Sequence, residues 1–270
     1  CSWMPFINVN GIQLHYEMEG NGTPLLIISG TGADLRNPRP ENPTLNGFRV
    51  LRYDQRGLGQ TASPKGAYTM ADYADDAAAL LESLEIDRVN VIGISFGGMV
   101  AQHLVTRFPH KVNKLVLACT SPGGNNFSSF DLRKIVSSSK NQIESWLQLL
   151  DSRYKIPEEN LPILNMVKDA LHTNTRLFPH LITDGLTRQL EARSGHDCVN
   201  SLRGIPHQTL IVGGRYDDIA PLKNLLEIHR LIKNSQLQIF EGGHLFLMQD
   251  KQAWPAIISF LVSESDTLKA

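Results

Sequence analysis

Ser95 is the residue of this 270-residue sequence whose surroundings best suit nucleophilic chemistry. It lies in the pentapeptide Gly93-Ile94-Ser95-Phe96-Gly97, directly after an apolar run. A serine hydroxyl attacks an acyl carbon when a base removes its proton and an acid orients that base. The pattern Gly-x-Ser-x-Gly alone arises by chance in roughly one chain in ten of this length, and a plain Gly/Ser loop is the alternative interpretation. The neighbouring elements and the partner residues must therefore distinguish a catalytic serine from a plain loop.

Two downstream segments supply candidates for the base and the acid. His244 follows two glycines in FEGGHLFL, and Asp217 follows two glycines in LIVGGRYDDIAP. The order serine, acid, histidine is the one expected of a nucleophile on a strand-to-helix turn. The alternative role for Asp217 and Asp218 is capping of the helix that Pro221 opens. We assign capping to Asp218 and the catalytic role to Asp217, because Asp217 lies nearer the end of the preceding strand.

The other histidines show no His-x-x-x-His or similar ligand spacing, so the sequence predicts no metal site and no organic cofactor. A structural role is the simpler interpretation for the histidines in or beside expected helices, which are His103, His110 and His229. For His196 and His207, which flank the return to the core, a structural and a functional role both stay open. His15 lies in the N-terminal hairpin, and His172 and His180 lie in a helical insertion.

The elements that must position these residues alternate between strands and helices. Asn10-Gly11 is a strong type I′ turn signal inside a hairpin over residues 6–18. Apolar strands are expected over residues 23–30, 48–54, 88–95, 111–119, 207–214 and 235–243, and helices over 69–86, 97–108, 221–232 and 254–264. Thr69 is the expected N-cap of the first helix. This alternation predicts an α/β fold with a mostly parallel eight-stranded sheet and helices on both faces.

A helical insertion interrupts this pattern. Residues 131–154, 161–172 and 183–195 show amphipathic helical spacing without a buried-strand pattern. We therefore expect a core formed by residues 1–122 and 201–270, with a helical cap over residues 123–200. In this arrangement Ser95 stands at the carboxyl edge of a parallel sheet, where α/β folds bind their ligands. The N–H of Phe96 then lies at a helix N-terminus, which favours an anion.

Composition excludes several other classes of function. The net charge is −1 without a long run of one sign, which gives no electrostatic case for nucleic acid or an anionic membrane. No apolar stretch reaches the length of a membrane-spanning helix, and the first residues do not resemble a secretory signal. The three cysteines imply no disulfide framework, and Cys198 is expected to be a buried structural thiol. We expect a cytoplasmic monomer or homodimer.

These motifs together resemble those of the α/β-hydrolase superfamily. The resemblance rests on Gly93 to Gly97, DQRGLGQT, GRYDDIAP and EGGHLF, and it covers the chain except the insertion, which takes the place of the family's cap. Within the superfamily the chain looks most like the small serine esterases and the 3-oxoadipate enol-lactonase-like branch. The resemblance implies backbone oxyanion donors at Phe96 and Thr31, although Ser29-Gly30 replaces the family's His-Gly pair. Asp54 and Arg56 are interpreted as mainly structural.

The resemblance implies hydrolysis of a small-molecule carboxylic ester or lactone through an acyl-enzyme on Ser95, with His244 as base and Asp217 as acid. A serine nucleophile argues against haloalkane dehalogenase or epoxide hydrolase activity, since those relatives use an aspartate. We expect the substrate to contact Trp146, Leu150, Phe178 and Leu245. A C–C bond hydrolase, an aminopeptidase, and a perhydrolase or acyltransferase remain alternatives on the same triad. A ligand-binding protein without catalysis is a further alternative, although such relatives usually lack a triad residue.

Overall fold

A computed structural model describes residues 5–37, 39, 45–136, 142–155 and 183–263. Within these residues, eight strands form one sheet in the spatial order β1-β2-β4-β3-β5-β6-β7-β8. The strands are β1 (Phe6–Val9), β2 (Ile12–Glu19), β3 (Thr23–Ile28), β4 (Phe48–Tyr53), β5 (Val89–Ile94), β6 (Val112–Ala118), β7 (Thr209–Gly214) and β8 (Ser235–Phe240). β1, β2 and β4 pair antiparallel, and all other neighbours are parallel. The predicted mostly parallel eight-stranded sheet is confirmed.

The hairpin that begins the sheet has the expected turn. Val9 pairs with Ile12, which leaves Asn10 and Gly11 as the two loop residues. Asn10 has a φ of 49° and Gly11 a φ of 74°. Two positive φ angles define a type I′ turn, whose twist matches that of the strands it joins. The Asn-Gly pair therefore fixes the register of β1 against β2.

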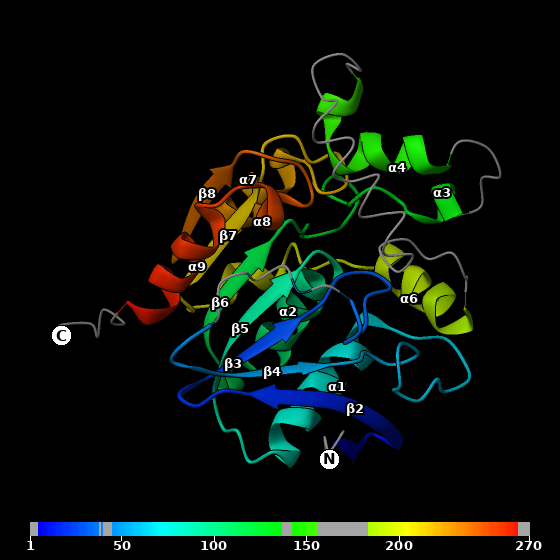
Figure 1. Cartoon of the computed structure of the whole chain (residues 1–270), viewed down its shortest axis with the longest axis vertical. Helices are drawn as coiled ribbons and strands as arrows, with labels where there is room; N and C mark the ends of the chain where they lie inside the picture. The colour runs from blue at the N-terminus through cyan, green and yellow to red at the C-terminus, as the bar shows by residue number, and fades with distance from the viewer. Residues whose placement is uncertain (1–4, 38, 40–44, 137–141, 156–182, 264–270) are drawn as a thin grey trace.

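Helices cover both faces of the sheet (Figure 1). Those of the core are α1 (Met70–Ser83), α2 (Phe96–Arg107), α7 (Leu222–Leu231), α8 (Phe246–Gln249) and α9 (Ala253–Val262), with short 3-10 turns η1 (Pro109–Lys111) and η3 (Ser201–Gly204). Residues of α1, α2 and α7 belong to one hydrophobic cluster, and residues of α8 and α9 to another. The two clusters lie on opposite faces, because side chains along a strand alternate between faces. In β3, Leu26 and Ile28 join the first cluster, while Leu25 and Ile27 join the second.

Helix α1 begins where its sequence predicts. Thr69 accepts a hydrogen bond from the N–H of Asp72 at 3.2 Å, and the Asp72 carboxylate accepts one from the N–H of Thr69 at 2.7 Å. These reciprocal bonds form a capping box, which satisfies two backbone donors that the helix leaves free. The expected N-cap role of Thr69 is confirmed.

Between β6 and β7 the described chain begins as a loop with isolated β-bridges at Gly123, and its regular elements are all helical. It contains α3 (Arg133–Val136), α4 (Gln142–Leu150), η2 (Ser152–Lys155) and α6 (Asp184–Ser194). Figure 1 shows α3, α4 and α6 on the side of the sheet where the parallel strands end. The helix expected over residues 161–172 lies outside the described residues. The cap boundaries at residues 123 and 200 stay a prediction.

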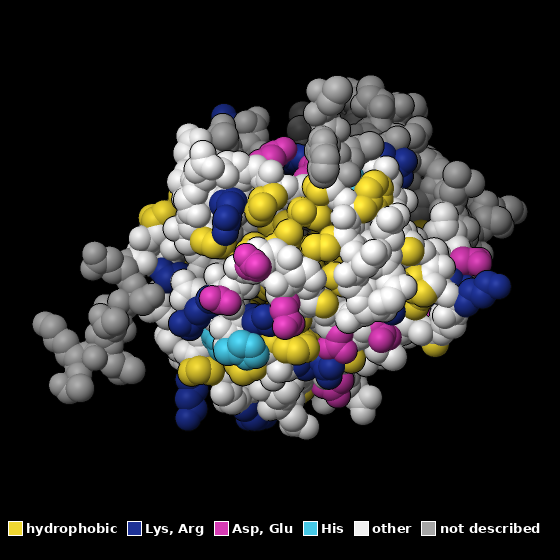
Figure 2. All heavy atoms as spheres, turned by 90° about the horizontal axis from the view of Figure 1, so that it is seen from below, with side chains coloured by type: hydrophobic (Ala, Val, Ile, Leu, Met, Phe, Trp, Pro, Cys, Tyr) yellow, Lys and Arg dark blue, Asp and Glu magenta, His cyan; other side chains and the backbone are white. Residues whose placement is uncertain are grey.

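The visible surface carries charges of both signs. Figure 2 shows acidic and basic side chains interspersed on the face seen from below, as the net charge of −1 suggests. Arg39, for example, lies between Glu17 and Glu19, at 2.6 and 2.8 Å from their carboxylates. Among the described helices, none combines the length and apolar character that crossing a membrane requires.

Candidate active site

Ser95 occupies a strained turn between β5 and α2. Its φ is 56° and its ψ is −115°, a combination that side-chain-bearing residues rarely adopt. A Cβ on Gly93 would overlap with the backbone of Gly97 and Gly98, and a Cβ on Gly97 would overlap with the carbonyl oxygen of Ile28. Glycine is therefore required on both sides of Ser95 for the turn to pack against the helix and the neighbouring strand.

His244 lies within hydrogen-bond distance of Ser95 on one side of its ring and of Asp217 on the other. The Nε2–Oγ distance to Ser95 is 2.9 Å, and the Nδ1–Oδ2 distance to Asp217 is 2.7 Å. An ionised carboxylate only accepts, so in the neutral imidazole Nδ1 carries the proton and Nε2 is free to accept from the Ser95 hydroxyl. These three residues come from the ends of β5, β7 and β8, and they meet at one edge of the sheet.

Asp217 combines two structural tasks. Its Oδ2 faces His244, while its Oδ1 accepts hydrogen bonds from the N–H groups of Ile219 and Ala220 at 2.8 and 2.9 Å. The side chain is buried, with 1% of its surface exposed. Pro221 is the N-cap of α7, and within the described residues no side-chain hydrogen bond caps this helix, so the expected capping role of Asp218 is wrong. The turn before α7 is held by Asp217 instead, because its carboxylate reaches the two N–H groups that follow it.

The loop that carries His244 is held by α4. The N–H of His244 donates to the carbonyl of Leu150, the last residue of α4, at 2.6 Å. A Cβ on Gly243 would overlap with that same carbonyl group, so the close approach depends on glycine. Helix α8, which the sequence did not predict, begins at Phe246 directly after the loop. The position of His244 is thus fixed by β8 before the loop, by α8 after it, and by the hydrogen bond to α4.

Two backbone donors lie beside Ser95. Within the described part of the chain, neither the N–H of Thr31 nor that of Phe96 has a hydrogen-bond partner. Phe96 is the first residue of α2, and Thr31 follows Gly30, where a Cβ would lie 3.4 Å from the Cβ of Ser95. Free N–H groups beside a nucleophile, one of them at a helix N-terminus, can receive a developing negative charge.

The loop that carries Thr31 is tied to its surroundings by side-chain amides. Gln55 donates to the carbonyl of Ser29 at 3.0 Å, and the Oε1 atom of Gln189 accepts from the N–H of Gly32 at 2.8 Å. Gln189 is fully buried in α6. Neither glutamine was a candidate from the sequence, because no local spacing relates either residue to the loop it holds.

Asp54 and Arg56 brace neighbouring loops, which agrees with the structural role expected for them. Asp54 pairs with His15 at 2.9 Å and accepts from the N–H of Leu35 at 2.7 Å. Arg56 contacts Asp76 through two nitrogens at 2.7 and 2.9 Å.

A cavity of about 190 Å³ opens at Ser95 and His244. Three of the four expected substrate contacts, Trp146, Leu150 and Leu245, line it, whereas Phe178 lies outside the described residues. The sequence missed further lining residues, which are Gly30, Ile94, Cys119, Leu132, Leu186, Leu190 and Ile219. Leu186 and Leu190 are spaced to share one face of α6, a signal that could have identified them. Apart from His244, no described lining residue carries an ionisable nitrogen or a carboxylate.

Cys119 is the second nucleophilic side chain at the cavity. Burial raises the pKa of its thiol well above the usual range, and the nearby negative charge of Asp217 raises the pKa further. The thiol is therefore protonated at neutral pH, and the protonated form is a poor nucleophile. Ser95, by contrast, lies 2.9 Å from His244 Nε2, a base that can take a hydroxyl proton.

Of the other described histidines, His110 is exposed, and the rest contact protein groups that do not line the cavity. His207 lies 2.9 Å from the carbonyl of Pro109, and His229 lies 2.8 Å from the hydroxyl of Ser235. His103 and His196 lie against each other at 3.1 Å. His172 and His180 lie outside the described residues.

Comparisons with known proteins identify relatives of this chain. A family model described as the alpha/beta hydrolase fold matches residues 23–251. A poly(3-hydroxyalkanoate) depolymerase of Ectopseudomonas oleovorans is 30% identical over 255 residues, covering 90% of this chain and 85% of that protein. A 2-hydroxy-6-oxo-2,4-heptadienoate hydrolase of Pseudomonas putida is 29% identical over 266 residues and covers 94% of each chain. The solved structure of the enol-lactonase from Burkholderia xenovorans LB400 has a TM-score of 0.76 at 25% identity and covers 96% of this chain and 100% of that one.

Proposed function

The chain belongs to the α/β-hydrolase family, and on this premise we propose that it is a serine hydrolase that cleaves a carboxylic ester or lactone through an acyl-enzyme on Ser95. The observation that carries the proposal is the continuous hydrogen-bond chain from Ser95 through His244 to Asp217, at 2.9 and 2.7 Å. These three hydrogen-bonded side chains are all the groups that the reaction needs for proton transfer. It also argues against the alternative of a ligand-binding protein without catalysis.

In the proposed reaction, His244 Nε2 takes the proton of Ser95 as its Oγ attacks the acyl carbon. The imidazolium then gives this proton to the departing alkoxide, and the acyl group stays on Ser95. A water molecule next loses a proton to Nε2 and attacks the acyl-enzyme, which releases the carboxylic acid and restores the serine hydroxyl. Asp217 holds the Nδ1–H tautomer and stabilises the imidazolium through its 2.7 Å contact.

The N–H groups of Phe96 and Thr31 are the proposed oxyanion donors. Their lack of partners within the described residues supports this role, because a donor already engaged would have to break a bond first. Each well-placed donor lowers the barrier by about 3–4 kcal/mol. The missing family histidine before Gly30 does not affect a backbone donor, and Gln55 and Gln189 hold this loop on either side.

The cavity favours a small or medium acyl group without charge. Its volume of about 190 Å³ is below the range of about 300–1,000 Å³ that is typical of pockets for drug-sized ligands. Its described lining is mostly apolar, with Trp146, Leu150 and Leu190 among its members. We propose that residues 123–200 act as a cap that supplies this lining, and contact between Phe178 and substrate stays a prediction. The relative named as a polyester depolymerase and the enol-lactonase neighbour support the ester and lactone class.

A C–C bond hydrolase is the second candidate, because a 29% identical relative is named for a heptadienoate and covers 94% of the chain. The substrate in that name is a carboxylate, and a buried carboxylate needs a cationic partner. Among the described lining residues no lysine or arginine faces the cavity. This observation favours the ester or lactone over the carboxylate-bearing diketone.

A fluorophosphonate probe followed by substrate profiling tests the proposal. We expect covalent labelling of Ser95 in the wild type, loss of labelling in Ser95→Ala and His244→Ala, and unchanged labelling in Ser63→Ala. An unlabelled wild type beside a labelled control esterase contradicts the enzyme assignment. A panel of p-nitrophenyl esters, lactones and a 2-hydroxy-6-oxo-dienoate, which is a diketone acid in its enol form, then separates the two candidates. Turnover of the diketone acid alone contradicts the ester or lactone assignment.

A further inference from the structure

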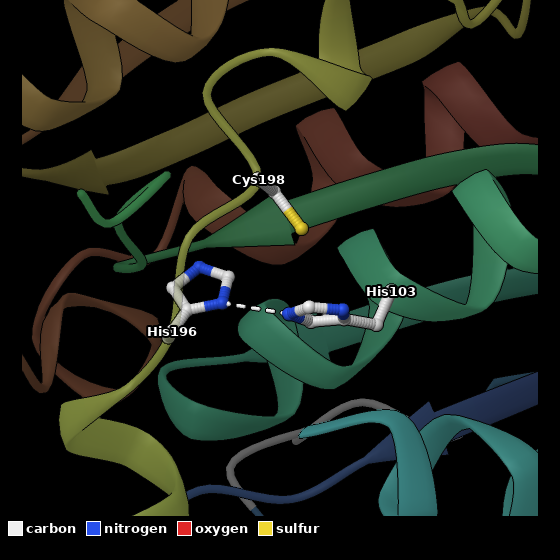
Figure 3. Close-up of side chains that lie close together, drawn as sticks. All are labelled: His103, His196 and Cys198. Atoms are coloured by element: carbon white, nitrogen blue, oxygen red, sulfur yellow. Dashed lines mark hydrogen bonds between the residues drawn. The ribbon is translucent and has the colours of Figure 1, made fainter. Parts of the chain in front are cut away.

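A second cluster of chemically capable side chains lies outside the lining of the Ser95 cavity. His103 from α2 and His196 and Cys198 from the segment after α6 point toward one another (Figure 3). Their ligand atoms all lie within 4.8 Å of one another. We propose that these three residues bind a zinc-class metal ion at a site separate from the proposed hydrolase site. The fourth coordination position is left to a water molecule.

The two imidazoles already have the spacing of metal ligands. His103 Nε2 and His196 Nδ1 are 3.1 Å apart. Two nitrogens bound tetrahedrally to zinc, each about 2.0–2.1 Å from the ion, lie about 3.3 Å apart. The sulfur of a bound cysteine lies about 3.6 Å from each nitrogen in the same geometry, so the Cys198 Sγ, which lies within 4.8 Å of both, has to close a gap of at most about 1.2 Å. Figure 3 shows this sulfur directed at the space between the two rings.

His196 is oriented by the group on its other nitrogen. Its Nε2 lies 2.9 Å from the carbonyl oxygen of Ser121, which can only accept, so Nε2 carries the proton. The lone pair of Nδ1 then points at the cluster. Metal-bound histidines usually donate their other ring N–H to a carbonyl or carboxylate in this way, which fixes both the tautomer and the ring. Without a metal, the same lone pair accepts a hydrogen bond from His103 Nε2–H.

The chemistry of the three ligands selects a class of metal. Two imidazoles and a thiol suit zinc or copper(I), whereas magnesium and calcium require oxygen ligands. The one acidic neighbour in sequence, Asp197, uses its carboxylate to accept from the N–H of Val199.

The backbone around the cluster is already fixed. Cys198 donates its N–H to the carbonyl of Pro122 at 2.8 Å, and Gly124 donates to the carbonyl of His196 at 3.1 Å. These bonds hold the segment after α6 against the segment after β6, and His103 approaches from α2. A metal here would therefore join α2, which begins directly after Ser95, to the segment where the chain returns to the core. We expect it to raise stability and to take no part in the hydrolysis.

Cobalt(II) spectroscopy on EDTA-treated protein tests the site. We expect a thiolate-to-cobalt charge-transfer band and visible bands of tetrahedral intensity that saturate at one ion per chain and disappear when zinc is added. Cys198→Ser should abolish the charge-transfer band, and His103→Gln should weaken binding at least tenfold. Cys119→Ser and Cys1→Ser, which change the other two thiols, should keep the band. A band that survives in Cys198→Ser, or none in the wild type, overturns the proposal.

Two measurements on the wild type test the site without variants, so they hold even where a variant fails to fold. Zinc at a hundredfold excess over its Kd should raise the Tm by about 4 °C or more, and magnesium should leave the Tm unchanged. Zinc-edge anomalous scattering from zinc-soaked crystals should give a peak between His103, His196 and Cys198. A peak only elsewhere, or equal effects of zinc and magnesium on the Tm, contradicts the site.

Discussion

The Oε1 atom of Gln189 accepts a hydrogen bond from the backbone N–H of Gly32 at 2.8 Å, although the two residues lie 157 positions apart. Gly32 has a φ of 70° and directly follows Thr31, a proposed oxyanion donor. Gln189 is buried in α6, and its Nε2 has no partner within the described residues. A side chain from the helical segment thus fixes the position of a loop in the core. Gln189 is a positioning residue for the proposed oxyanion site.

We expect Gln189→Leu to lower kcat for a short-chain ester by about tenfold with little change in KM. The leucine removes the acceptor of a part-buried N–H, so the loop loses a fixed position, while the apolar lining remains. Steady-state kinetics separates the two parameters. Glu191→Ala, at an exposed position of the same helix, should leave both unchanged. A rise in KM alone would show that Gln189 acts on substrate binding instead.

We expect Asp217→Asn to reduce kcat by about 10⁴-fold while the Tm stays near that of the wild type. The asparagine oxygen can still accept from Ile219 and Ala220, but its NH₂ group now faces His244 Nδ1. The imidazole must then carry its proton on Nε2, where it cannot accept from Ser95. Asp217→Ala should lose both kcat and Tm, since the turn before α7 loses its acceptor. Equal Tm losses in the two variants would contradict this separation.

We expect Ser95→Ala and the double variant Ser95→Ala/His244→Ala to have equal residual activity. The activity losses caused by substituting residues that act as one unit do not add, because without the nucleophile the base has no proton to remove. Rates with a p-nitrophenyl ester, corrected for the uncatalysed reaction, measure this. A further large drop in the double variant would indicate that His244 works with another nucleophile.

We expect Leu190→Ala to shift the preference of the enzyme toward longer acyl chains. Leu190 lines the cavity from α6, so the truncation enlarges the space beside Ser95. The measurement is the ratio of kcat/KM between long-chain and short-chain esters. Leu225→Ala is the matched control, since Leu225 is fully buried between α7 and β7 and does not line the cavity. Both variants should lose about 2–3 kcal/mol of stability, and only Leu190→Ala should change the ratio.

The sequence was sufficient to predict the sheet and the meeting of Ser95, Asp217 and His244. Buried parallel strands are continuous apolar runs, and residues that follow such strands must gather at one sheet edge. It was not sufficient for contacts between elements that only packing brings together. Gln189 on Gly32 and His103 beside His196 are such pairs, because no sequence spacing relates them. Asp218 was misassigned because the sequence does not show which of the two adjacent carboxylates reaches the N–H groups of the turn before α7.

The pair formed by His103 and His196 predicts a pH dependence of stability. Burial lowers the pKa of His103 to about 4 and that of His196 to about 3, whereas the unfolded chain binds these protons near pH 6.5. Between those values the unfolded state holds more protons, so the free energy of unfolding falls as the pH falls from about 6.5 toward 4. Burial lowers the pKa of His207 as well, which adds in the same direction.

Urea unfolding of EDTA-treated protein at several pH values between 7 and 4 measures this slope. Each buried neutral histidine contributes at most about 1.4 kcal/mol per pH unit, because it binds one proton on unfolding. His103→Gln should reduce the slope, since one of these protons no longer binds. His229→Gln, at an exposed position, should keep the slope of the wild type. An unchanged slope in His103→Gln would show that His103 takes up no proton on unfolding and would contradict the prediction.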